Sequence, residues 1–137
     1  MATRESKKTI LVTGGAGHVG SHVIELLVAD ERNRVISLDN YFNGSVENHI
    51  PGADYREGHT KDIAHLVPET PDIVYHLGEY ARIAPSFEDV QLVYDMNIAG
   101  TFAVAEFCRT LKVKKLVYAA SSTKFAIEGD GRHQHER

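Results

Sequence analysis

Three glycines at a spacing of three, Gly14, Gly17 and Gly20, constrain the fold of this chain more than any other feature. They follow residues 9–13, a β-branched apolar run without polar alternation, which is typical of a strand buried on both faces of a parallel sheet. After them, apolar residues recur at helical spacing as far as residue 28. The sequence therefore predicts a strand, a tight glycine turn and a helix.

The spacing gives each glycine a separate task at such a turn. Gly14 permits the sharp bend off the strand, Gly17 lets a ligand approach the backbone, and Gly20 lets the helix pack closely on the sheet. The free N–H groups of the first helical turn, together with the helix dipole, then favour an anion such as a pyrophosphate. A purely structural turn is the alternative interpretation of the same glycines.

An acidic residue stands where a dinucleotide-binding site needs one. Asp39 follows a second strand-like run and lies 19 positions after Gly20, the place of the carboxylate that accepts hydrogen bonds from ribose hydroxyls. A capping role after the strand is the alternative. A carboxylate there repels a 2′-phosphate, and no lysine or arginine follows before Arg56. The pattern favours NAD over NADP.

The rest of the chain alternates strands with helices. Further strands are expected at residues 34–38, 53–57, 72–77 and 114–120, helices at 62–67 and 85–111, and a loop with one helical turn at 40–52. This order predicts an α/β fold with a doubly wound parallel sheet of the Rossmann, NAD(P)-binding type. About five strands make it incomplete relative to the full dinucleotide fold. Residues 9–128 are expected to form this domain, with a polar lead (1–8) and a polar tail (129–137).

Composition excludes several other classes of function. A chain of 137 residues suits one domain, and a net charge of −4 without clustered Lys and Arg argues against a nucleic-acid partner. No apolar run is long enough to span a bilayer, and the single cysteine, Cys108, fits a reducing compartment, so we expect a cytoplasmic protein. The eight histidines are scattered without a cysteine cluster, so no metal site is expected.

These motifs together resemble a known family. The glycine loop, Asp39-Asn40, His76-Leu77, Asn97 and the late Ser121-Ser122-Thr123 are similar to those of the extended short-chain dehydrogenases/reductases. Within that family the chain looks most like the N-terminal part of the NAD-dependent nucleotide-sugar epimerases and dehydratases, the group that includes the UDP-glucose 4-epimerases. The resemblance runs from about residue 8 to residue 126.

The resemblance implies a set of site residues. Against the cofactor it places Gly14, Gly17, His18, Val19, Gly20, Asp39, Asn40, Asn43, Gly44, Leu77, Gly78, Glu79, Tyr80, Ala81 and Asn97. The family's adenine-binding Asp followed by an apolar residue is replaced after the third strand, where His59 and Thr60 are expected by position. Ser121 matches the serine that hydrogen-bonds the substrate hydroxyl, and Thr123 is its expected partner. Glu79 is an unusual acid beside a pyrophosphate.

One departure concerns catalysis itself. Family chemistry requires a Tyr-x-x-x-Lys pair, in which the two side chains share one helix face, and none of the six tyrosines has a lysine four residues later. The sugar-binding C-terminal region is absent too, so we expect the chain alone to be inactive. The nucleotide-sugar substrate then belongs to the full-length isomerase-type enzyme, with a homodimer through the helix around residues 90–111. The alternative is a non-catalytic NAD-binding or interaction domain.

Overall fold

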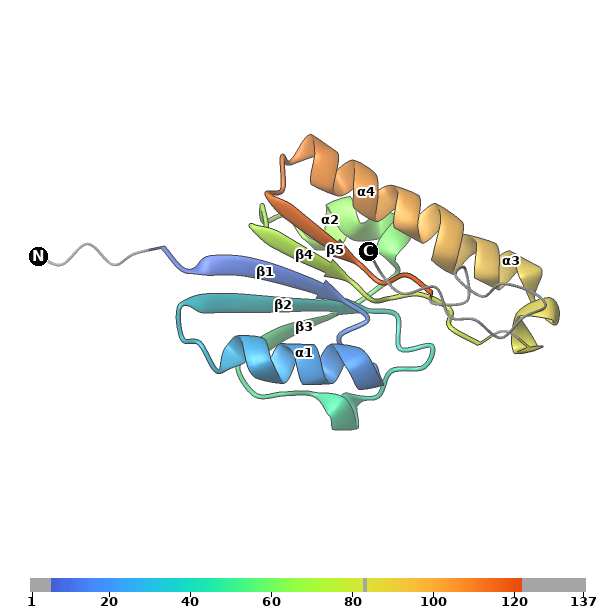
Figure 1. Ribbon diagram of the computed structural model, residues 1–137, viewed down its shortest axis with the longest axis horizontal. Coiled ribbons are helices and arrows are strands. Elements are labelled where there is room, and N and C mark those ends of the chain that lie inside the picture. The colour runs from blue at the N-terminus through green and yellow to red at the C-terminus, as the bar shows by residue number, and fades with distance from the viewer. Residues whose placement is uncertain (1–5, 83, 122–137) are drawn as a thin grey trace, which may run out of the picture.

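The computed structural model describes residues 6–82 and 84–121, which form one sheet with helices on both faces (Figure 1). All strand pairs are parallel, in the order β3-β2-β1-β4-β5. The strands are β1 (Lys8–Thr13), β2 (Asn33–Asp39), β3 (Ala53–Glu57), β4 (Ile73–His76) and β5 (Lys115–Tyr118). The predicted doubly wound parallel sheet of five strands is confirmed.

Helices cover the two faces of this sheet unequally (Figure 1). On one face lies α1 (His18–Val28), and on the other lie α2 (Ile63–Leu66) and α4 (Gly100–Thr110). A short α3 (Val90–Val93) and a π-helical stretch, Tyr94–Ala99, run directly into α4. In the part of the chain that the structure describes, three 3-10 turns complete the connections, at Val46–Asn48, Thr60–Asp62 and Ala84–Phe87. Among the described residues, no helix has the length and apolar character required to cross a membrane.

Alternate residues of the strands build two separate apolar cores. Leu11 packs with α2 and α4 in a cluster that includes Val104 and Phe107, whereas its neighbour Val12 packs with Ile24 of α1. Successive side chains of a strand point to opposite faces, so a strand without polar alternation supplies both layers. The apolar run read from the sequence as a doubly buried strand therefore has the burial that it predicts.

The long C-terminal helix begins later than the sequence indicates. Pro85, expected to open it, lies in a separate 3-10 turn, and the continuous helical stretch begins at Val90. Asp89 precedes it, and its side chain accepts a hydrogen bond from the backbone N–H of Leu92 at 2.9 Å. An aspartate that satisfies an otherwise unpaired N–H at this place sets the start of the helix.

The strand order shows at which end of the sheet a ligand can bind. From β1 the chain moves outward through β2 to β3, and β4 and β5 add on the opposite side of β1. The carboxyl ends of β1 and β4 therefore border the point at which the order reverses. In open parallel sheets ligands bind in the crevice at this point.

Candidate functional site

The glycine loop between β1 and α1 is packed too closely to admit side chains. Gly14 has a φ of +73°, and a Cβ there would lie 2.8 Å from the backbone of Gly78, beyond the end of β4. A Cβ on Gly20 would overlap the carbonyl oxygen of Gly14. A Cβ on Gly17 would meet only that same oxygen, at 3.2 Å, and otherwise point into open space. Gly14 and Gly20 thus shape the loop, and Gly17 keeps its outer surface clear.

The start of α1 is open to an anion. Its N-cap is Gly17, which has no side chain to satisfy the first N–H groups of the helix, and the first turn contains no acidic residue. The N–H groups of His18, Val19 and Gly20 are the ones that an α-helix leaves unpaired at this end. Their partial positive charge, added to the helix dipole, favours a phosphate group.

Asp39 ends β2 beside this loop and is 7% exposed. Its Oδ2 accepts a hydrogen bond from the N–H of Ala16 at 2.9 Å, and its Oδ1 accepts one from the N–H of Tyr41 at 2.8 Å. A carboxylate offers about four acceptor positions, so two bonds to the protein leave room for two from a ligand. The carboxylate is therefore fixed against the glycine loop and can still accept hydrogen bonds from hydroxyl groups.

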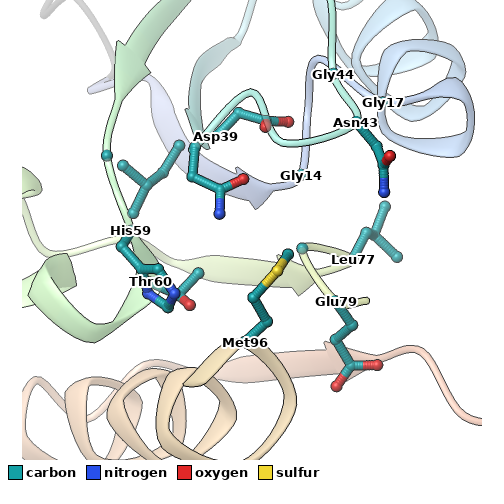
Figure 2. Close-up of a pocket in the computed structure, with 14 residues that line it drawn as sticks. Gly14, Gly17, Asp39, Asn43, Gly44, His59, Thr60, Leu77, Glu79 and Met96 are labelled. Atoms are coloured by element: carbon teal, nitrogen blue, oxygen red, sulfur yellow. The ribbon is translucent and has the colours of Figure 1, made fainter. Parts of the chain in front are cut away.

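A pocket lies at the carboxyl ends of β1 to β4, and Figure 2 shows the side chains around it. The structure brings together eleven of the predicted cofactor residues here. They are Gly14, Gly17, Asp39, Asn40, Asn43, Gly44, His59, Thr60, Leu77, Gly78 and Glu79. None of the residues that line this pocket is lysine or arginine, which fits a ligand without an additional phosphate on its ribose.

The other predicted residues lie around the pocket without lining it. His18 and Val19 are exposed on the first turn of α1, and Gly20 is buried beneath the loop. Ala81 is exposed beyond the residues that follow β4.

Asn97 contacts the backbone of the loop after β4. Its Oδ1 accepts a hydrogen bond from the N–H of Tyr80 at 2.7 Å, and its Nδ2 donates one to the carbonyl oxygen of Tyr80 at 2.9 Å. Both polar atoms of the amide are thus engaged with one residue. Asn97 holds this loop in place beside the pocket.

Three residues that line the pocket were not predicted from the sequence. From the sequence alone, Leu38, which precedes Asp39, is predicted to be a core residue of a strand. Met96 is indistinguishable there from the many other apolar residues of a long helix. Figure 2 shows the Met96 side chain pointing toward the pocket. Gly58 carried a usable signal, because a glycine directly after a strand marks a turn at the carboxyl edge of the sheet.

A buried histidine lies under the same end of the sheet. His76 Nδ1 is 2.7 Å from Thr13 Oγ1, and Nε2 is 3.0 Å from Thr101 Oγ1. Burial lowers the pKa of His76 to about 4, although the carboxylate of Glu79 lies 3.7 Å from Nε2 and favours the charged form. Burial dominates, because the Thr13 hydroxyl, which accepts from the N–H groups of Leu77 and Gly78, donates to Nδ1 and opposes its protonation. The imidazole is therefore neutral at neutral pH.

The two residues expected at an adenine ring lie in the turn after β3. The Nδ1 atom of His59 accepts a hydrogen bond from the N–H of Lys61 at 3.0 Å, so the proton of the neutral ring is on Nε2. That Nε2 atom is buried without a hydrogen-bond partner in the described structure. Burial, and then the charge of Lys61, lower the pKa of His59. Thr60 lies beside it and is buried.

Of the two predicted catalytic residues, Ser121 is the last residue that the structure describes. Ser121 is exposed and follows β5, and Thr123 lies outside the described residues. Within the described part of the chain, no group of three or more His, Cys, Asp and Glu side chains could hold a metal ion.

Comparison with known proteins agrees with this geometry. The sequence pattern of the NAD dependent epimerase/dehydratase family matches residues 10–136, nearly the whole chain. The chain belongs to this family. A curated relative, the UDP-glucose 4-epimerase of Streptococcus mutans, is 28% identical over 123 residues, which are 86% of this chain and 37% of the relative. The chain thus spans little more than a third of the length of the curated relatives it matches.

Solved structures show the same fold. The UDP-glucose 4-epimerase of Thermus thermophilus, in complex with NAD, has a TM-score of 0.80 and 31% identity, over 93% of this chain and 42% of that chain. The Thermotoga maritima enzyme, with UDP-glucose, has a TM-score of 0.75 and 33% identity, over 80% of this chain and 37% of that one. The predicted cofactor, NAD, is the cofactor of the family.

Proposed function

We propose that this chain is the NAD-binding N-terminal portion of a nucleotide-sugar epimerase or dehydratase. The observation that carries the proposal is the Asp39 carboxylate, which is fixed by the N–H of Ala16 against a glycine loop that opens onto an uncapped helix. Ribose hydroxyls and a pyrophosphate are the groups that this pair of features recognises. The open surface at Gly17 leaves the space that such a ligand requires.

The two halves of the cofactor would contact different strands. We assign the pyrophosphate to the N–H groups of His18 and Val19, and the adenosine ribose to Asp39 and Asn40, beside the loop that carries Asn43 and Gly44. The unpartnered Nε2–H of His59 supports an adenine contact there, because adenine ring nitrogens accept hydrogen bonds.

The second half of the cofactor would lie over the residues that follow β4. These are Leu77, Gly78, Glu79, Tyr80 and Ala81, with Asn97 holding their backbone. When bound, NAD supplies a hydride acceptor and, once reduced, a hydride donor. The protein's part in this half is to hold the ligand and to exclude water with Leu77 and Met96.

Turnover would require groups that this sequence does not contain. Ser121 and Thr123 would hydrogen-bond a hydroxyl of the nucleotide sugar, as in the family. No tyrosine of the chain has lysine four residues later, so the usual proton-transfer pair would come from elsewhere. We therefore propose that the chain binds NAD without catalysing the reaction alone, in the cytoplasm, where the free thiol of Cys108 is stable.

We also propose that two copies associate through the helical stretch 90–111. Val90, Tyr94, Ile98 and Phe102 form a stripe at a spacing of four and are 51–70% exposed. An apolar groove between α2 and α4, lined by Val67, Phe107 and other residues, adjoins Phe102. Large exposed apolar side chains in one row are typical of an interface. Phe102→Glu is expected to convert a dimer, measured by sedimentation, into a monomer, and a monomeric native chain would contradict this.

Calorimetric titrations with NAD and with NADP test the proposed cofactor site. The native chain is expected to prefer NAD, and Asp39→Asn to lose most of that preference because the repulsion of a 2′-phosphate disappears. Asp39 also holds Ala16 and Tyr41, so the ratio of the two affinities is a better readout than either affinity alone. Absence of binding to both dinucleotides would refute the proposal, and equal native affinities would remove only the preference for NAD.

A further inference from the structure

Glu79 is an acidic side chain on the opposite side of the pocket from Asp39. Asp39 ends β2, Glu79 follows β4, and β1 lies between these strands in the sheet. Figure 2 shows the two carboxylates on opposite sides, with Met96 pointing between them. Because a dinucleotide lies across the reversal of strand order, a ligand whose adenosine ribose binds Asp39 places its second base over β4 and β5. Glu79 thus lines the part of the pocket in which the nicotinamide half of the ligand would bind.

A chain of hydrogen bonds with one direction holds Glu79 in place. Thr13 Oγ1 accepts hydrogen bonds from the N–H groups of Leu77 and Gly78, at 3.2 and 3.1 Å, so its own proton points to His76 Nδ1 at 2.7 Å. Nδ1 is then an acceptor, and the ring proton on Nε2 points to Thr101 Oγ1 at 3.0 Å.

The last member of this chain is the carboxylate. Thr101 Oγ1 donates its proton to Glu79 Oε1 at 3.0 Å. Thr13, His76 and Thr101 each donate to the next group in the chain, so the arrangement is complete when Glu79 accepts as a carboxylate. Its side chain is 19% exposed and has little freedom to leave the pocket wall.

No cation among the residues that line the pocket offsets this charge. The lining contains no lysine or arginine, and His76 beneath it is neutral because burial lowers its pKa to about 4. At the end of β5, the charge of Glu79 also raises the pKa of Tyr118, so its influence reaches the neighbouring strand. Leu77 and Met96 make this wall of the pocket partly apolar, which weakens the screening of charge by water.

We propose that Glu79 makes this site select the oxidised form of its dinucleotide. The nicotinamide ring is a cation when oxidised and neutral when reduced, and the rest of the two molecules carries the same charge. A fixed carboxylate at the nicotinamide half therefore attracts only the oxidised ring. The inference rests on the proposed NAD site and adds to it a residue that discriminates between redox states.

The test compares dissociation constants of the intact chain for NAD⁺, NADH and ADP-ribose, by calorimetry. Glu79→Gln is expected to raise the ratio of the NAD⁺ to the NADH dissociation constant between about threefold and thirtyfold, for one charge a few ångströms away in a partly apolar wall. Glu79→Asp retains the charge and is expected to stay near the native ratio. Glu25→Gln, at an exposed position of α1 that does not line the pocket, makes the same change of net charge and is the matched control.

ADP-ribose lacks the nicotinamide ring and separates the two proposals. Its affinity is expected to change in Glu79→Gln by the same factor as that of NADH, because both ligands meet only the repulsion between the carboxylate and the pyrophosphate. Failure of the native chain to bind either ADP-ribose or NAD⁺ would overturn the proposed function itself. If NAD⁺ binds and the ratio is unchanged in Glu79→Gln, the role of Glu79 is overturned while the cofactor site stands. If Glu79→Gln does not fold, Glu79→Ala supplies the neutral side chain.

Discussion

The buried imidazole of His76 makes the stability of this domain depend on pH in a defined direction. In the folded chain its pKa is lowered from 6.5 to about 4 by burial, whereas in the unfolded chain it has its ordinary value. Below pH 6.5 the unfolded state therefore binds a proton at His76 that the folded state does not bind until the pH approaches 4. The stabilisation that the neutral imidazole contributes is therefore fully present above pH 6.5 and is lost as the pH falls toward 4.

The size of the effect follows from the difference between the two pKa values. One pKa unit corresponds to about 1.4 kcal/mol, so this shift amounts to about 3 kcal/mol of unfolding free energy across the window. The lowered pKa of His59 acts in the same direction. Acidic groups with lowered pKa values, Glu69 and Asp30 at about 2, lose their contributions mainly below the window.

Urea unfolding followed by circular dichroism, at pH values from above 6.5 down to about 4, measures this loss. His76→Gln is the informative variant, because a glutamine amide can accept from Thr13 and donate to Thr101 without titrating. We expect its unfolding free energy to fall less steeply with pH than that of the native chain. His65→Gln, at an exposed position of α2, should retain the native slope.

The comparison of slopes can refute the reasoning. Equal slopes for the native chain and His76→Gln, with both proteins folded at neutral pH, would show that His76 titrates normally. The neutral ring that the hydrogen-bond chain from Thr13 to Glu79 requires would then be confined to pH values above about 6.5.

Two further predictions concern the loops that shape the pocket. Gly20→Ala is expected to lower the unfolding free energy by about 2–3 kcal/mol, because its Cβ overlaps the backbone of Gly14. Compared with Gly20→Ala, Gly17→Ala should lower the stability much less and the NAD affinity more. A larger loss of stability in Gly17→Ala by thermal unfolding, or a smaller loss of NAD affinity by calorimetry, would contradict these roles. Asn97→Ala is expected to cost about 1–3 kcal/mol, since it leaves the N–H and carbonyl of Tyr80 without partners. Asn97→Asp keeps only the acceptor and should recover part of the loss, and an unchanged melting temperature in Asn97→Ala would show that Tyr80 is held by other means.

The features that could be predicted from the sequence are local ones. The glycine spacing and the position of Asp39 each depend on a few consecutive residues whose backbone demands are specific. Four of the five strands were predictable for the same reason, because each contains a short apolar run that ends at a turn, whereas β3 (Ala53–Glu57) is mostly polar. The bounds of β3 match the prediction, and the ends of the other strands differ from it by one or two residues, as at β5, which stops at Tyr118.

The contacts between distant residues could not be predicted in this way. Thr13 and His76 are 63 positions apart, and neither shows in the sequence that the other satisfies its polar atoms. Met96 reads as one apolar residue among many, and only the packing of the helix turns it toward the pocket. The late start of the helix depends on Asp89, a cap that the preceding Pro85 obscured.

The most direct measurement of the central claim is a titration of the ¹⁵N-labelled chain with NAD, followed by the shifts of its backbone amides. Saturable changes are expected at the glycine loop, including Gly17 and His18, at Asn40 and at Gly78, with none on the exposed stripe at Ile98 and Phe102. The expected result is saturable shifts at the glycine loop, Asn40 and Gly78 in the native chain, and the loss of these shifts in Asp39→Ala. Amides that do not move at millimolar NAD, or that move only along the stripe, would contradict it.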